Sequence, residues 1–290
     1  MAAPSAGDTG PEASQEAVAR STWPSADGTP IHVRHWPAAG DAWATVLIVH
    51  GIGEHSGRYE RTGQLMANAG LDVYAFDLRG HGLSGGRRVY VRRWDDFLDD
   101  LELRLAQVRQ EGLPLVLLGH SMGALIALTY VCSDRPGPEL LVLSAVPLGA
   151  RTPAWQRVLA PVLSRVAPTL LVANPISGDQ LSRDPAVGTA YFADPLVQPR
   201  STARLGAELL RTMRRARSQV DRINVPTLAI HGGADTLVPT VVSEPLASAR
   251  AVERRVLPIL RHETLNEPEG PEVVAAIVEW LRSRVRIAAG

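Results

Sequence analysis

Lysine is absent from this 290-residue sequence, so all 30 basic residues are arginines, and they are balanced by 30 acidic residues. A formal charge of zero argues against nucleic acid or a strongly anionic membrane surface as the main partner. Cysteine occurs once, at Cys132. A single cysteine excludes an internal disulfide and is typical of a reducing compartment. Because Cys132 falls in an apolar stretch, we expect it to be a buried structural thiol.

Long apolar runs are also missing. No segment reaches the roughly 18 uninterrupted apolar residues that indicate a membrane-spanning helix. The first 20 residues are rich in Ala, Ser, Gly, Pro and Glu and have no apolar core of the kind found in signal peptides. We therefore predict a disordered tail over residues 1–20. We also predict a cytoplasmic protein, with no more than a transient, peripheral contact at a membrane surface.

Short apolar runs alternate with amphipathic stretches along most of the chain. The runs 44–49, 71–77, 115–118 and 139–146 have the length of strands that are buried on both faces. Between two of them, residues 94–108 place apolar side chains at steps of three and four, which predicts a helix with one apolar face. The alternation predicts an α/β fold with a mostly parallel central sheet flanked by helices.

The alternation is interrupted once. Residues 148–219 contain no convincing strand but two amphipathic helical patterns. Strand–helix alternation resumes at Val225, with a strand expected over 225–231, a helix near 241–251 and a strand over 254–260. We predict that this segment is a helical cap inserted after the sixth strand, between two parts of one core, 21–147 and 220–290. An antiparallel hairpin over residues 21–36, with Asp-Gly at its turn, is expected to begin the first part.

Residues 119–123 form a Gly-x-Ser-x-Gly segment with Ser121 at its centre. The segment follows the apolar run 115–118 and precedes an Ala- and Leu-rich stretch, so the predicted order of strand, tight turn and helix is that of a nucleophile elbow. Glycines suit the turn because a side chain there would crowd the strand and the helix. The same pattern recurs at 82–86, but no helix begins directly after Ser84. We therefore select Ser121 as the nucleophile.

A serine hydroxyl is a poor nucleophile without an adjacent base, which a carboxylate orients. In sheets of this order the acid and then the histidine follow the serine along the chain. His262 is the last histidine of the sequence, and Asp235 comes just after the predicted strand 225–231. We predict Ser121, Asp235 and His262 as the catalytic residues. His120 adjoins the serine, but it should face away because successive strand side chains point to opposite sides.

Ester cleavage places negative charge on the carbonyl oxygen, which two backbone N–H groups must stabilise. The N–H of Met122, directly after the nucleophile, supplies one by position. The loop after the run 44–49 should supply the other, because Gly51 and Gly53 leave its backbone accessible. We choose the N–H of Ile52.

Two motifs, residues 50–59 (HGIGEHSGRY) and 119–123 (GHSMG), together resemble the monoacylglycerol lipase family of α/β-hydrolases. The resemblance implies the α/β-hydrolase fold, the catalytic and oxyanion residues named above, and a helical cap that forms an acyl tunnel. The chain departs from the family pattern at Ala124, where glycine is usual, and at Ile52, where alanine or leucine is frequent. The residues that the resemblance places near the glycerol-binding end are Glu54, Arg58 and Tyr191.

The apolar residues of the predicted cap have three possible roles. They line an acyl pocket, dock on a lipid surface, or simply pack the cap onto the sheet. We carry Leu148 and Leu170 as candidates for the pocket lining. Glu54 and Arg58 could equally form an exposed ion pair, which would contribute little to stability. The resemblance alone favours a functional use of that pair.

The site residues predict a serine ester hydrolase that works through an acyl-enzyme, with no metal or organic cofactor, and the resemblance implies that its substrate is a monoacylglycerol. A carboxylesterase acting on short-chain or non-lipid esters, or a lysophospholipase, is the alternative within enzymes. A non-catalytic binding protein of the same fold is the remote alternative, and it predicts that a member of the triad is missing.

Overall fold

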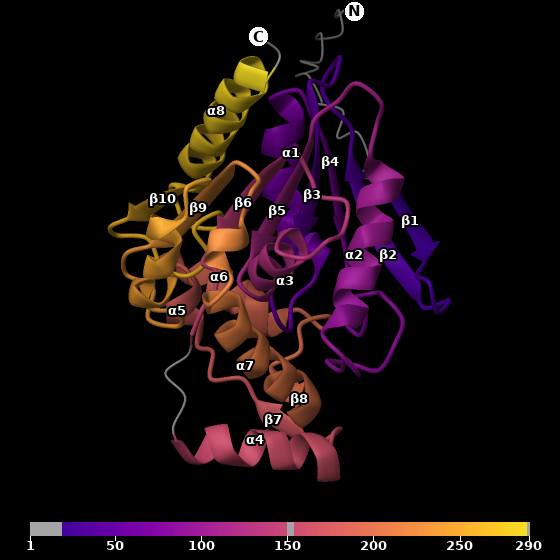
Figure 1. The fold of residues 1–290 in the computed structure, drawn as a ribbon, viewed down its shortest axis with the longest axis vertical. Coiled ribbons are helices and arrows are strands. Elements are labelled where there is room, and N and C mark those ends of the chain that lie inside the picture. Colours follow the sequence, from indigo (N-terminus) through magenta and orange to yellow (C-terminus); the bar gives the residue numbers. More distant parts are fainter. Residues whose placement is uncertain (1–18, 150–153, 289–290) are drawn as a thin grey trace, which may run out of the picture.

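The computed structural model describes residues 19–149 and 154–288, which form a central eight-stranded sheet with the strand order β1-β2-β4-β3-β5-β6-β9-β10 (Figure 1). β1 and β2 form the predicted antiparallel hairpin, and β2 also pairs antiparallel with β4. From β4 to β10 every pair is parallel. The predicted mostly parallel sheet is therefore confirmed, while most of the predicted tail lies outside the described residues. The strands are β1 (Ala19–Pro24), β2 (Pro30–Trp36), β3 (Ala44–Val49), β4 (Leu71–Phe76), β5 (Leu115–His120), β6 (Leu140–Ser144), β9 (Thr227–Gly232) and β10 (Val252–Leu257).

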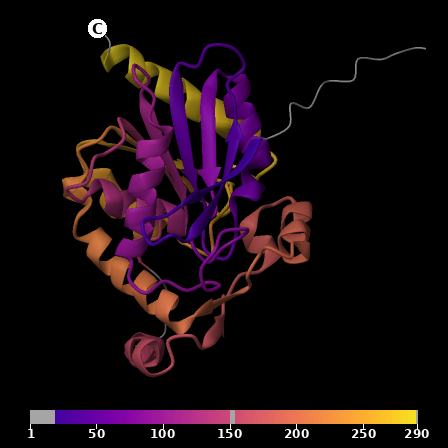
Figure 2. The ribbon, with the colours of Figure 1, turned by 90° about the vertical axis from the view of Figure 1, so that its right-hand side faces the viewer.

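Helices cover both faces of the sheet (Figures 1 and 2). α1 (Glu60–Asn68) and α8 (Gly270–Ala288) pack on one face. α2 (Asp95–Val108) and α3 (Met122–Val131) pack on the other. Neighbouring strand residues alternate between the two apolar layers, so that Leu47 joins the second layer and Ile48 the first. Burial on both faces explains why these strands are continuous apolar runs.

The chain between β6 and β9 lies beyond one end of the sheet, in the lower part of Figures 1 and 2. Its described part contains four α-helices, a short 3-10 helix and a small antiparallel sheet of β7 and β8. The prediction that this segment has no strand is wrong, because strands of three residues are too short to show a periodic pattern. The elements are α4 (Ala154–Val166), β7 (Leu171–Ala173), α5 (Gly178–Leu181), α6 (Pro185–Ala193), β8 (Arg200–Thr202) and α7 (Ala203–Arg217).

Two boundaries in the last part of the chain differ from the expected ones. The helix expected near residues 241–251 is a 3-10 helix, η3 (Thr240–Ser248), which contains Pro245 and so lacks one backbone donor. The strand expected over residues 254–260 is β10, which ends at Leu257. His262 therefore lies on a loop several residues beyond the strand. A short 3-10 turn, η2 (Val220–Arg222), precedes β9.

Candidate active site

Ser121 lies between β5 and α3, at the sharp turn that the glycine spacing predicts. Its φ of 52° is in the left-handed region, which is uncommon for a residue other than glycine and is found at strained functional turns. A Cβ atom at Gly119 would lie 2.5 Å from the carbonyl oxygen of Gly123, and one at Gly123 would lie 2.1 Å from that of Val49. Only glycine fits at both positions, so the two glycines allow the strand, the turn and the helix to pack closely.

Ser84 occupies a structural position, as the missing helix after it predicts. Its hydroxyl donates to the carbonyl oxygen of Asp77 at 2.6 Å and accepts from the N–H of His32 at 2.9 Å. The side chain is buried. These bonds leave Ser84 no role as a nucleophile.

The structure brings Ser121, His262 and Asp235 into one hydrogen-bonded chain. His262 Nε2 lies 3.1 Å from Ser121 Oγ, and His262 Nδ1 lies 2.8 Å from Asp235 Oδ2. All three residues are at most 9% exposed. Since a carboxylate only accepts, Nδ1 carries the proton and Nε2 is left to accept the serine proton. This is the arrangement that a base needs in order to activate a serine hydroxyl.

Asp235 is held by both of its oxygens. Oδ1 accepts from the N–H groups of Leu237 at 2.9 Å and Val238 at 2.8 Å, and His231 Nε2 lies 3.3 Å from Oδ2. Burial acts to raise the pKa of Asp235, but hydrogen bonds from His231, His262 and the backbone outweigh it and hold the pKa well below its usual range. The carboxylate therefore stays ionised beside His262. Sequence reasoning missed His231, whose only signal is its place four residues before Asp235.

The prediction that His120 faces away from the nucleophile is wrong. Its ring lies 4.9 Å from the ring of His262, centre to centre, and it lines the same cavity as Ser121. The alternation argument fails because Ser121 has left the strand conformation. Burial, followed by the proximity of His262, lowers the pKa of His120 to about 4. His120 is therefore neutral at neutral pH, and its Nδ1 lies 3.2 Å from Ser144 Oγ.

The loop after β3 packs directly against Ser121. A Cβ atom at Gly51 would lie 3.3 Å from Ser121 Cβ, so the backbone of this loop approaches the serine closely. His50 Nε2 accepts from the N–H of Leu78 at 2.9 Å, so its Nδ1 carries a proton and donates to the Gly51 carbonyl oxygen at 2.7 Å. That carbonyl belongs to the same peptide as the N–H of Ile52. His50 thus sets the direction of the N–H that we selected for the oxyanion.

Glu54 and Arg58 form a buried network rather than an exposed pair. Glu54 Oε1 accepts from the Gly51 N–H at 2.5 Å and from the Tyr59 hydroxyl at 2.9 Å. Arg58 Nη1 lies 2.6 Å from Glu54 Oε2 and also 2.6 Å from Glu263 Oε1. Burial acts to raise the pKa of Glu54, but the charge of Arg58, the neighbouring imidazoles and the hydrogen bond from the Gly51 N–H together outweigh it, and the pKa falls to about 2. Arg58 therefore links the loop after β3 to the residue next to His262.

The cavity beside Ser121 is small, about 30 Å³. Of the residues predicted to bind substrate, Glu54 and Tyr191 line it and Arg58 lies behind them, 4.7 Å from the centre of the Tyr191 ring. The Tyr191 hydroxyl is buried and has no hydrogen-bond partner among the described residues. Residues of the lining that sequence reasoning did not select are Ile176, Leu181, Leu237 and Glu263.

Leu148 and Leu170 do not line this cavity, contrary to their selection from the sequence. Leu148 is 1% exposed and packs in the apolar layer under α3. Leu170 is 48% exposed and precedes β7, on the outer surface of the inserted segment. Their apolar character alone did not distinguish core, surface and pocket.

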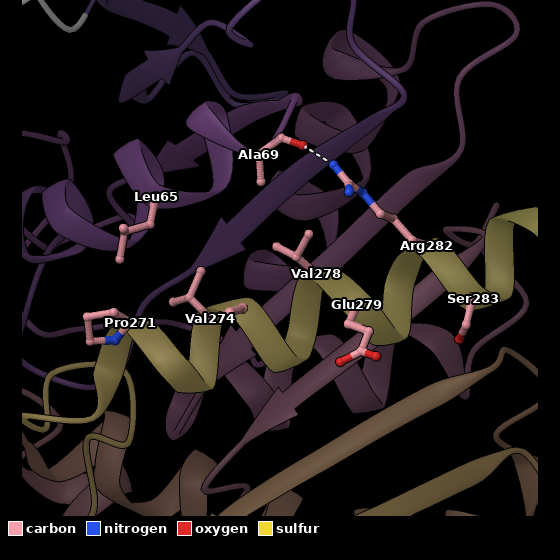
Figure 3. A pocket seen from close by; sticks show the side chains of 9 residues that line it. Leu65, Ala69, Pro271, Val274, Val278, Glu279, Arg282 and Ser283 are labelled. Carbon is pink, nitrogen blue, oxygen red and sulfur yellow. Dashed lines mark hydrogen bonds between the residues drawn. The ribbon is translucent and has the colours of Figure 1, made fainter.

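A larger cavity, about 510 Å³, lies between α1 and α8 (Figure 3). Leu65, Val274 and Val278 line it, and Arg282 reaches across to donate to the Ala69 carbonyl oxygen at 2.8 Å. It shares no lining residue with the cavity at Ser121. We therefore place the chemistry in the smaller cavity.

The described part of the chain offers neither a metal cluster nor a membrane-spanning helix. Within 19–149 and 154–288, no group of three or more His, Cys, Asp or Glu side chains is arranged to hold a metal ion. None of the described helices has both the length and the hydropathy needed to cross a bilayer. Cys132 is buried and free, as expected, and burial raises the pKa of its thiol to about 11.

Two buried histidines predict a loss of stability in mild acid. Burial lowers the pKa of His81 to about 3 and that of His120 to about 4, from an ordinary value of 6.5. Below pH 6.5 the unfolded chain takes up protons at these residues and the native chain does not. Stability should therefore fall by about 1.4 kcal/mol per pH unit for each of them.

The urea midpoint, measured in steps from pH 7 downwards, checks this prediction. The window between pH 6.5 and 4.5 isolates the histidines, because 4.5 is the ordinary pKa of a glutamate. A midpoint that stays constant across this window would contradict the prediction.

Comparison with known proteins gives concordant matches. A family model described as serine aminopeptidase, S33, matches residues 40–269. The monoacylglycerol lipase of Mycolicibacterium smegmatis is 36% identical over 262 residues, covering 86% of this chain and 92% of that protein. The monoglyceride lipase of Homo sapiens is 34% identical over 220 residues, covering 73% of this chain and 72% of that protein.

Solved structures agree with these matches. The monoacylglycerol lipase of Paleococcus ferrophilus superposes with a TM-score of 0.80 at 32% identity, covering 88% of this chain and 99% of that one. A soluble variant of the monoglyceride lipase of Saccharomyces cerevisiae superposes with a TM-score of 0.83 at 21% identity, covering 96% and 99% of the two chains, and shows that the fold is shared. The predicted α/β-hydrolase fold is thus confirmed.

Proposed function

This chain belongs to the serine aminopeptidase (S33) family of α/β-hydrolases and is related within it to the monoacylglycerol lipases, and from that premise we propose that it hydrolyses monoacylglycerols to fatty acid and glycerol. The observation that carries the proposal is the hydrogen-bonded chain from Ser121 through His262 to Asp235 beside the loop that holds Ile52. All three members of the triad are in place, which argues against a non-catalytic binding protein.

In the proposed reaction, Ser121 Oγ attacks the ester carbonyl carbon while His262 Nε2 takes the serine proton. Asp235 holds the imidazole in the correct tautomer and stabilises its charged form. The N–H groups of Ile52 and Met122 stabilise the oxyanion. His262 then gives its proton to the leaving glycerol oxygen, and an acyl-enzyme remains. Water, activated by the same imidazole, releases the fatty acid and regenerates Ser121.

The glycerol end of the substrate is assigned to the polar side of the cavity. The buried Tyr191 hydroxyl supports this assignment, because a buried polar group without a partner is costly unless a ligand supplies one. Glu54 lies on the same side, but its oxygens are already used by Gly51, Tyr59 and Arg58. We therefore assign direct glycerol recognition to Tyr191 and a supporting role to Glu54 and Arg58.

Replacing Tyr191 by phenylalanine tests this assignment. Loss of one hydrogen bond should lower kcat/KM for a monoacylglycerol about fivefold. The p-nitrophenyl ester of the same fatty acid has no glycerol, so its kcat/KM should stay within about twofold of the wild-type value on the same reasoning. Equal losses on the two esters would contradict a role in glycerol recognition.

The acyl chain requires more room than the cavity offers. A volume of about 30 Å³ holds only one or two water molecules, since each needs roughly 10–15 Å³ of such space. Ile176 and Leu181 of the inserted segment form one apolar wall, and Leu237 forms another. We propose that residues 148–219 act as a cap whose displacement opens the acyl site.

We also propose that the cap contacts lipid surfaces transiently. α4 and β7 lie side by side at the end of the molecule opposite α8 (Figure 1). They and the short turn between them expose apolar side chains that are 43 to 73% accessible. Exposed apolar patches of this kind often mark contact surfaces. The side chains are Leu159, Val162, Val166, Leu170, Leu171 and Val172.

The decisive experiment measures substrate preference directly. Purified protein should hydrolyse a long-chain monoacylglycerol, and in a p-nitrophenyl ester series it should prefer medium or long chains to acetate. A strict preference for acetate would indicate a short-chain carboxylesterase, and faster turnover of a lysophospholipid would indicate a lysophospholipase. A fluorophosphonate probe that left Ser121 unlabelled in folded protein would overturn the assignment of the nucleophile.

A further inference from the structure

Glu267 lies five residues after His262, on the loop between β10 and α8, and its side chain is fully buried. Its two oxygens face different parts of the chain. Oε1 accepts from the N–H of Arg261 at 2.6 Å. Oε2 accepts from the N–H of Arg183 at 2.9 Å and from the Ser182 hydroxyl at 3.1 Å. One buried carboxylate thus joins the catalytic-histidine loop to the inserted segment.

Backbone hydrogen bonds extend the same junction. The N–H of Glu263 donates to the carbonyl oxygen of Leu181 at 2.8 Å, and that of His262 lies 3.4 Å from the carbonyl oxygen of Gln180. Arg261 Nη1 donates to the carbonyl oxygen of Ser182 at 3.0 Å. The strip 180–183 therefore runs along residues 261–263. Its Leu181 side chain also lines the cavity at Ser121.

We propose that Glu267 is a positioning residue that fixes the peptide between Leu260 and Arg261, one residue before His262, and holds it in register with the cavity wall at Leu181. The inference rests on the proposed ester hydrolysis. His262 must stay within hydrogen-bond reach of Ser121 as a base and of the leaving oxygen as an acid. A displacement of about 1 Å in such a group costs on the order of 100-fold in rate.

The chemistry of the carboxylate predicts that glutamine does not substitute for it. Both oxygens of Glu267 accept from N–H or O–H donors. Glutamine keeps the shape but has one accepting oxygen and one donating NH₂ group. In Glu267→Gln a donor must therefore face either Arg261 or the pair Ser182 and Arg183. One side of the junction is broken whichever way the amide turns.

Glu269 supplies a matched control. It also pairs with Arg183, but its side chain is 41% exposed. Among the residues that the structure describes, its only side-chain ion pair is with Arg183, so it does not bridge to residue 261. Glu269→Gln removes an ion pair to the same arginine and leaves the contact between Glu267 and Arg261 in place.

The test compares kcat/KM for an ethyl ester and a p-nitrophenyl ester of one fatty acid. Ethoxide is a poor leaving group and needs the proton from His262, whereas p-nitrophenolate leaves with little help. A misplaced imidazole should therefore slow the ethyl ester more. In Glu267→Gln we expect kcat/KM to fall about 30-fold for the ethyl ester and about threefold for the p-nitrophenyl ester. Glu269→Gln should leave both within about twofold, as a surface ion pair predicts.

Equal losses on the two esters would overturn the proposal, because a smaller folded fraction lowers every rate by one factor. Wild-type rates on both esters would overturn it as well. If Glu267→Gln does not fold, Ser182→Ala is the second variant, because it removes one donor to Oε2. It should again slow the ethyl ester more than the p-nitrophenyl ester, with smaller losses on both. Equal rates or equal losses on the two esters in Ser182→Ala would also overturn the proposal. If the wild-type protein cleaves both test esters but no monoacylglycerol, the proposed substrate is wrong. The comparison of the two esters would still test the role of Glu267.

Discussion

Ser121→Ala is expected to lower ester turnover by about 10⁶-fold, the loss seen when the nucleophile of a serine triad is removed. In the proposed mechanism the Ser121 hydroxyl forms the acyl-enzyme, and no other serine lines the cavity among the described residues. His262 and Asp235 remain paired in the variant, but they have no oxygen to activate. A monoacylglycerol hydrolysis assay with a high enzyme concentration measures the residual rate.

The variant should keep its fold. Alanine meets the same left-handed backbone at position 121 as serine does, so the strain of the turn is unchanged. The substitution removes the hydrogen bond between the serine hydroxyl and His262 Nε2. We expect a thermal midpoint within a few degrees of wild type, which corresponds to about 1 kcal/mol or less. A folded variant that keeps a tenth of the activity would exclude Ser121 as the nucleophile.

Asp235→Asn should cost about 10⁴-fold in kcat, because it presents the wrong group to His262. The backbone N–H groups of Leu237 and Val238 both point at Oδ1, so they select the oxygen of the asparagine amide. Its NH₂ group must then face His262 Nδ1. That nitrogen can only accept, the imidazole proton moves to Nε2, and the base can no longer take the serine proton.

Asp72→Asn is the control for this substitution. Asp72 makes a comparable bond, 2.6 Å from His35 Nε2, on β4 and far along the sheet from Ser121. Its replacement should leave kcat within about threefold of the wild-type value. The contact between Asp72 and His35 lies away from the reacting atoms, so it does not determine which nitrogen of His262 carries the proton. A loss of less than tenfold in Asp235→Asn would show that another carboxylate orients the base.

Local patterns predicted most of the sheet and the elbow. Strands buried on both faces leave continuous apolar runs, so β3, β4, β5 and β6 were found within a few residues of their bounds. The spacing of the glycines around Ser121 is a reliable signal, because an added Cβ atom would lie only 2.5 Å from a backbone oxygen at Gly119 and 2.1 Å at Gly123. Chain order alone then selected Asp235 and His262, which the structure brings together with the serine.

Contacts between distant segments were not predictable. The ion pair between Arg58 and Glu263 joins residues that are 205 positions apart, and the local sequence around either residue does not predict it. Resemblance placed Arg58 at the glycerol end, whereas the structure places it behind the cavity wall. Leu148 and Leu170 were equally apolar in the sequence, and only the packing of the inserted segment separates a core residue from a surface one. Whether the His120 side chain lies on the same side as Ser121 depends on the unusual φ angle of Ser121.

The hydrogen bond from His50 to the Gly51 carbonyl oxygen has a consequence for how the proposed enzyme starts its reaction. Because a neutral, buried imidazole holds this peptide plane, the Ile52 N–H that we propose as an oxyanion donor is oriented before any ester binds. In the proposed mechanism, substrate binding energy is then not consumed in orienting this donor. The activity of such an enzyme would be controlled by the access of the ester to the cavity, rather than by formation of the oxyanion site.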